Sequence, residues 1–356
     1  MTNALDRQDS ANGDEALAHD LANFADSDAT EPKPENLREG WETETRLNKV
    51  GKQLGYDEKE WSRYARICER AAHRTQLPEA AALFQIGQLN GARRIPQPDW
   101  NLVAQFLRDT GSRIAGLGEG TRKQRVQELH AYHHGITARY TGDYKAAAEF
   151  HRKIAENNEA RNDPVGTAIS RLSEQVDRFS QALLEGSETE QLLAPLEEAA
   201  QRVVASCTDD QDSTQTQWHY FSAPAHVLEA HIWSKRPITP ESEARWLAIL
   251  TEEFAVKDPK QFENLQPTII GIKAGLAMLK NDRNEALRLA QEVETVHIER
   301  AMPNARATAV FVLNALGEDQ AYTGPGALES ACGYMHQVIA LIRRNREQYI
   351  NQPRQN

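Results

Sequence analysis

The sequence is poor in cysteine and has no long hydrophobic run. Its three cysteines, Cys68, Cys207 and Cys332, lie far apart with no CxxC or zinc-ligand spacing. Such cysteines are expected to be free thiols in a reducing compartment, packed as small buried hydrophobes. The first twenty residues have neither a basic start nor an apolar run, and no later run approaches the length that a bilayer requires. We therefore expect a cytoplasmic protein with no membrane partner.

Positive charge is also scarce, and the excess of negative charge is concentrated at one end. The net charge is −11, and residues 1–40 contribute ten Asp and Glu against three Lys and Arg, a local balance of −7. The remaining residues are close to neutral, which argues against a nucleic-acid-binding face because such a face needs many cations. Residues 1–40 contain one aromatic residue, Phe24. With so little apolar surface to bury, this segment is predicted to be a disordered acidic tail.

Recognisable catalytic motifs are missing as well. The stretch Gly116–Gly120 (GLGEG) is not preceded by a strand, so it is interpreted as an interhelical loop and not as a phosphate loop. The acidic run Asp209–Asp212 (DDQD) resembles the magnesium motif of all-α terpene cyclases, but Ser213 stands where a further aspartate is required. A polar loop is the simpler interpretation. No cofactor is predicted and a non-enzymatic role is favoured, with an all-α enzyme whose site is built from distant residues as an alternative.

What the sequence does contain is helical periodicity from Trp41 onward, with almost no strand-like alternation. Capping residues precede a proline at Asp163–Pro164 and Thr239–Pro240, and Ser187 with Glu190 is spaced as a capping box. Short breaks predict antiparallel neighbouring helices. The predicted helices are 43–54, 58–75, 78–90, 99–115, 121–140, 144–160, 164–185, 188–206, 215–234, 240–255, 259–279, 282–300, 304–316 and 326–348.

Residues 131–155 (AYHHGITARYTGDYKAAAEFHRKIA) carry the clearest repeat signal. Gly135 is a small residue suited to close helix approach, Gly142–Tyr144 forms a turn triplet, and Ala147 is a small residue in the second helix. This segment resembles one unit of the tetratricopeptide repeat (TPR) family. Residues 271–293 repeat the pattern without the turn tyrosine, and the two turns lie 139 residues apart, near four periods of roughly 34 residues.

The resemblance implies an all-α fold, an α-solenoid of antiparallel helical hairpins. The chain then divides into an acidic tail (1–40), an N-terminal helical module (41–115), a TPR-like repeat region (116–348) and a short C-terminal tail (349–356). A non-repetitive helical protein that uses small residues for packing is the alternative.

TPR arrays bind peptides or partner segments on a concave face lined by the first helix of each pair. In the best unit the resemblance places the following partner-binding residues on that face: Leu129, Tyr132, His133, Ile136, Arg139 and Tyr140. It implies a protein- or peptide-binding adaptor or scaffold with an unidentified partner. The alternatives are a ligand- or peptide-responsive regulator, and that several of these side chains pack against the next hairpin.

The histidines of the same helix also invite a metal interpretation. His130 and His134 are four residues apart on one helix face, which is acceptable metal-ligand spacing. Residues 131 and 132 are Ala and Tyr, so there is no HExxH motif and no third ligand is evident. No metal site is predicted. His133 lies on an apolar stripe with Val126 and Ile136 and is interpreted as a packing residue.

Overall fold

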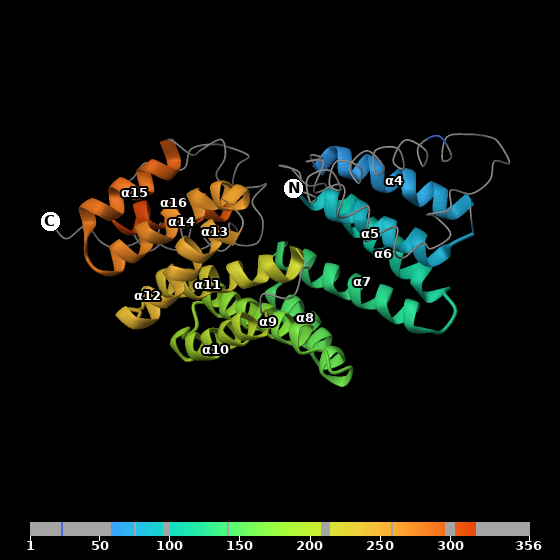
Figure 1. The fold of residues 1–356 in the computed structure, drawn as a ribbon, viewed down its shortest axis with the longest axis horizontal. Helices are drawn as coiled ribbons and strands as arrows, with labels where there is room; N and C mark the ends of the chain where they lie inside the picture. The colour runs from blue at the N-terminus through green and yellow to red at the C-terminus, as the bar shows by residue number, and fades with distance from the viewer. Residues whose placement is uncertain are drawn as a thin grey trace, which may run out of the picture. The chain divides into compact units, whose positions relative to one another are not determined.

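The computed structural model describes residues 58–74, 76–94, 100–140, 142–207, 214–257, 259–295 and 303–317, together with Asn23. Every regular element in these ranges is a helix and none is a strand, which confirms the predicted all-α class for this part of the chain (Figure 1). The predicted helices 43–54 and 326–348, the acidic run at 209–212 and, apart from Asn23, the two predicted tails lie outside the described residues.

The helix bounds follow the sequence prediction closely, and those of α7, α8, α9 and α14 coincide with it. The elements are α4 (Glu58–Arg74), α5 (Pro78–Arg94), α6 (Trp100–Ala115), α7 (Thr121–Tyr140), α8 (Tyr144–Ala160), α9 (Pro164–Glu185), α10 (Glu190–Ser206), α11 (Thr214–Ser234), α12 (Pro240–Ala248), the π-helix η1 (Ile249–Glu253), α13 (Phe254–Lys257), α14 (Pro259–Leu279), α15 (Arg283–Thr295) and α16 (Pro303–Ala315).

The chain divides into two compact units, Met1–His134 and Gly135–Asn356, with the division inside α7. In the first unit α5 packs against both α4 and α6. A carboxylate links these three helices, because Glu69 on α4 accepts hydrogen bonds from Gln88 on α5 and from Arg113 on α6, the latter at 2.6 Å. The predicted burial of Cys68 is confirmed, since this free thiol is 1% exposed.

In the second unit, helices that follow one another in sequence lie in contact. The helix α9 packs between α8 and α10, and α11 contacts α10 and α14 (Figure 1). One large apolar core joins α9 to α14, and a second cluster joins α14, α15 and α16. Cys207 is 7% exposed as predicted, and burial raises the pKa of its thiol. No helix in the described ranges is both long and apolar enough to cross a membrane.

Small residues occur where helices approach closely. A Cβ added at Gly135 would lie 3.0 Å from His151 Nε2 and 3.3 Å from Phe150 Cβ, so glycine permits the contact between α7 and α8. In the following turn, Gly142 has a φ of +83°, a left-handed conformation that favours glycine. Asp143 then caps α8 by accepting the Ala146 N–H at 3.0 Å.

Three local predictions meet different outcomes. The capping roles of Asp163 and Thr239 are confirmed, since each side chain accepts a backbone N–H at the start of its helix. The Ser187–Glu190 capping box is wrong: α10 begins at Glu190 with Thr189 as the preceding residue, and no side chain caps it. The predicted helix 240–255 is interrupted by η1, where Tyr220 of α11 donates to Glu253 at 2.5 Å.

Candidate functional site

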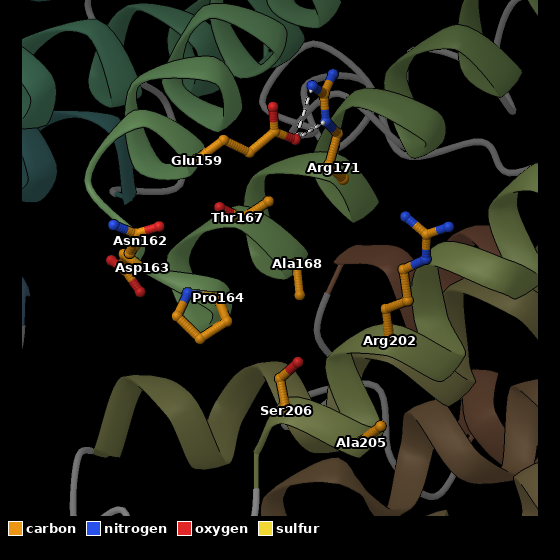
Figure 2. A pocket seen from close by; sticks show the side chains of 10 residues that line it. All are labelled: Glu159, Asn162, Asp163, Pro164, Thr167, Ala168, Arg171, Arg202, Ala205 and Ser206. Atoms are coloured by element: carbon orange, nitrogen blue, oxygen red, sulfur yellow. Dashed lines mark hydrogen bonds and ion pairs between the residues drawn. The ribbon is translucent and has the colours of Figure 1, made fainter.

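An open pocket of about 590 Å³ lies in the second unit, where the turn from α8 to α9 faces the C-terminal end of α10 (Figure 2). Its walls come from two stretches of the sequence, residues 159–171 and residues 202–206. The lining residues are Glu159, Asn162, Asp163, Pro164, Thr167, Ala168, Arg171, Arg202, Ala205 and Ser206.

The turn that forms one wall is fixed by local hydrogen bonds. Asn162 adopts a φ of +55°, and the Asp163 N–H returns to the Asn158 carbonyl at 3.0 Å. Asp163 Oδ1 accepts the Gly166 N–H at 2.8 Å, and Pro164 occupies the first helical turn. The Asp163 carboxylate therefore has a defined position at the rim of the pocket.

A second part of the wall is Arg171, whose charge is neutralised by two carboxylates of the protein itself. Arg171 donates to Glu159 at 3.0 Å from Nη2 and to Glu174 at 2.9 Å from Nη1. The Glu174 side chain is only 3% exposed and also pairs with Arg178 at 2.7 Å. Two carboxylates thus hold the guanidinium of Arg171, which makes it a rigid part of the wall.

Arg202, across the pocket, is held far less firmly. Among the described residues its one ion-pair partner is Glu198, one helical turn earlier on α10, at 2.6 Å, and the two side chains are 64% and 63% exposed. Exposed pairs of this kind contribute little to stability, so the guanidinium can exchange partners at small cost. Figure 2 shows Arg202 on the opposite side of the pocket from Asp163, with Ala168 between them.

The chemistry of this pocket suits binding. It offers an anion, a loosely held cation and a floor of small side chains from Pro164, Ala168 and Ala205. Among the residues that the structure describes, no group of three His, Cys, Asp or Glu side chains is arranged to hold a metal ion. No sequence motif predicted this pocket, because it forms between a turn and the end of another helix.

None of the described residues predicted to bind a partner is among those that line this pocket. Leu129 packs against the apolar cluster of the first unit, and His133 is 8% exposed, with its ring edge-on to that of Tyr132. Ile136 is partly buried, and Arg139 is engaged with α9. The side chain of Tyr140 lies outside the described residues. The interpretation of His133 as a packing residue is confirmed.

His130 and His134 are also used for packing. His130 Nε2 lies 2.9 Å from the Leu107 carbonyl oxygen of α6. The ring also packs closely on Gly111, since a Cβ added there would lie 3.2 Å from His130 Cε1. The two imidazole rings meet edge to face at 4.6 Å. Burial, and then the charge of His130, lowers the pKa of His134 to about 4.

A buried polar cluster in the second unit escaped sequence reasoning. Asp177 on α9 is fully buried and accepts from Arg139 Nε at 2.5 Å and from His151 Nδ1 at 2.7 Å. His219 and His226, seven residues apart on α11, face the same charges. Burial, followed by the charge of Arg139, lowers the pKa of His219 to about 4 and that of His226 to about 3.

This cluster links four helices and is closed to substrates. The His151 and Asp177 side chains are 1% and 0% exposed, so a histidine–carboxylate pair that superficially suits catalysis is sealed inside the helices. The available signal was the seven-residue spacing of the two α11 histidines, which places them on one helix face. The sequence alone could not show that these histidines face Arg139, His151 and Asp177, because those three residues lie on three other helices.

Comparison with protein-family models, curated proteins and solved structures finds no match to this chain. Its function must therefore be argued from the geometry of its own residues.

Proposed function

We propose that this protein is a protein- or peptide-binding adaptor with a TPR-like solenoid, and that it binds its partner at the pocket between the α8–α9 turn and α10. One observation carries the proposal: an open pocket of about 590 Å³ holds a fixed anion and a loosely held cation on a floor of small side chains. That combination offers polar anchoring and room for a chain segment.

The helix arrangement supports the TPR-like part of the proposal. Successive helices from α8 to α11 contact one another in sequence order. Small residues lie at the close approaches, with Gly135 facing α8 and Gly275 facing Ile232 of α11. Ala274 and Ala286, from the second repeat-like segment, are buried in one cluster.

The pocket is a stronger candidate than the α7 face that the resemblance implied. Leu129 and His133 are engaged in packing, and Arg139 is committed to a buried carboxylate. Withdrawing Arg139 to meet a partner would leave the Asp177 charge buried without that cation, which is costly. Arg202 carries no such penalty, because both members of its pair are exposed.

A pull-down with matched tryptophan variants tests this proposal. Ala205→Trp places an indole in the pocket from an exposed position of α10, and Ala194→Trp places one at an exposed position of the same helix that does not line the pocket. Tagged wild type and both variants are used to capture partners from native cells, with mass spectrometry as the readout and circular dichroism confirming the fold.

We expect one protein partner to be retained by the wild type and by Ala194→Trp and lost by Ala205→Trp. Equal retention by all three chains would refute the pocket as the binding site. Enrichment of no protein would refute the adaptor proposal.

A further inference from the structure

We infer that the ligand of this pocket is a peptide segment carrying one basic and one acidic side chain, the basic one against Asp163 and the acidic one against Arg202. This inference rests on the proposed adaptor function and specifies the chemistry of the partner. It follows from how each charge in the pocket is already used.

Asp163 is the acidic residue of the pocket that no described Lys or Arg neutralises, whereas Glu159 is paired with Arg171. Its carboxylate accepts one backbone N–H, that of Gly166, and no Lys or Arg among the described residues forms an ion pair with it. Capping geometry holds this carboxylate at the rim, so a ligand gains a pre-positioned acceptor without ordering a flexible side chain. A Lys or Arg side chain is the complementary group.

Arg202 is the positive charge most easily transferred to a ligand. Its exposed pairing with Glu198 costs little to break, and a guanidinium forms two parallel hydrogen bonds with a carboxylate. Arg171 cannot take this role, because Glu159 and the buried Glu174 already hold it. The two arginines of the pocket therefore differ in function, and only Arg202 is available to an acidic side chain.

The floor between the two charges sets the remaining requirement. Pro164 and Ala168 present small, uncharged side chains there, and Figure 2 shows both between Asp163 and Arg202. A ligand that meets both charges must cross this floor, which a peptide backbone with two oppositely charged side chains can do. A ligand of one charge sign would meet a like charge on one side of the pocket.

The test uses the full chain and fluorescein-labelled Gly/Ser peptides that carry one Lys and one Glu at several separations. Control peptides replace the Lys or the Glu by Gln, and binding is followed by fluorescence anisotropy. Asp163→Asn removes the charge but retains a good helix cap, and Arg202→Gln removes the other charge. Asp143→Asn, which alters the cap of α8, and Arg288→Gln, which alters an exposed arginine of α15, are the matched controls.

We expect the wild type to prefer the best Lys/Glu peptide to either control peptide by about tenfold, the equivalent of one good charged contact. Asp163→Asn should lose the preference for Lys and keep that for Glu, and Arg202→Gln should do the reverse. The two control variants should behave as the wild type.

The inference is overturned if no Lys/Glu peptide binds, or if the two variants change both preferences equally. The tryptophan pull-down separates this failure from that of the proposed function. A partner lost only by Ala205→Trp, together with indifference to peptide charge, would leave the adaptor function standing and refute the charge assignment.

Discussion

Arg139 and Asp177, on α7 and α9, form an ion pair in which Arg139 Nε donates to Asp177 Oδ1 at 2.5 Å. The carboxylate is 0% exposed and the guanidinium 16% exposed, so neither charge is well solvated. The second carboxylate oxygen accepts from His151 of α8 at 2.7 Å. One buried aspartate thus joins three successive helices, and its removal would leave a cation in a poorly solvated site.

We predict that Asp177→Asn destabilises the protein by about 3–5 kcal/mol, the range for breaking a buried pair by removing one partner. Urea unfolding followed by circular dichroism measures the change. The control is Arg152→Gln, which removes an exposed arginine paired with Glu149 and Glu156 and should leave the unfolding midpoint unchanged.

A double variant keeps this prediction testable if Asp177→Asn folds poorly. Arg139→Gln together with Asp177→Asn removes both charges and should be less destabilised than the sum of the single variants. Strict additivity would show that the pair is not coupled.

The helices themselves could be predicted from the sequence because apolar periodicity and capping chemistry are local. Asp163 before Pro164 located the start of α9 correctly. The Ser187–Glu190 spacing failed because α10 begins at Glu190 itself, so Ser187 lies too early in the sequence to cap it. The π-helix at Ile249–Glu253 was likewise unpredicted, since it keeps the helical pattern of apolar residues.

The site could not be predicted, because its residues become neighbours only through tertiary packing. Arg202 lies on α10 and Asp163 in the turn before α9, and the capping pattern of Asp163 and Pro164 carries no information about a pocket. The prediction did find that Gly135 permits close approach, because a small residue on a helical stripe has a local meaning. It placed the partner site on α7, where Arg139 instead meets a carboxylate 38 residues away in sequence.

Acidification should destabilise the protein through the α11 histidines. The folded-state pKa values of His219 and His226, about 4 and about 3, lie below the ordinary value of 6.5, so the unfolded chain binds protons first as the pH falls. The stability is fully present above pH 6.5 and declines as the pH falls toward 4. At pH 5 the loss is about 2 kcal/mol per histidine.

The variant His226→Gln isolates one of these contributions. Its free energy of unfolding should fall less than that of the wild type between pH 7.5 and pH 5, because one of the groups facing Arg139 and Asp177 no longer titrates. Urea unfolding at both pH values provides the comparison. An identical decline in both proteins would show that His226 is not held neutral by burial.

Glu229 should act in the opposite direction. Its side chain is 3% exposed, its Oε1 has no hydrogen-bond partner among the described residues, and burial raises its pKa to about 8. In the unfolded chain the Glu229 carboxyl group ionises near pH 4.5, while in the folded chain it keeps its proton. The free energy of unfolding is therefore highest below pH 4.5 and decreases as the pH rises toward 8. At pH 7 this cost is about 3 kcal/mol.

We therefore predict that Glu229→Gln raises the melting temperature at pH 7.5 and leaves it nearly unchanged at pH 3.5, where the glutamate is largely neutral in both states. Thermal unfolding at the two pH values measures the difference. Glu263→Gln, at an exposed position of α14, should show no such pH-dependent gain. A loss of stability at pH 7.5 would mean that Glu229 is ionised in the folded protein.

Close packing between α11 and α14 depends on a glycine. A Cβ added at Gly275 would lie 2.6 Å from both Cδ1 and Cγ2 of Ile232, and Ile232 is fully buried and cannot swing aside. We predict that Gly275→Ala destabilises the protein by about 1–3 kcal/mol, the usual cost of overpacking.

Gly118→Ala, where an added Cβ meets nothing within 4 Å, should not be destabilised in thermal unfolding. Because Ile232→Ala removes the clashing atoms, the double variant Gly275→Ala/Ile232→Ala should be less destabilised than the sum of the singles, and additive losses would contradict a direct clash.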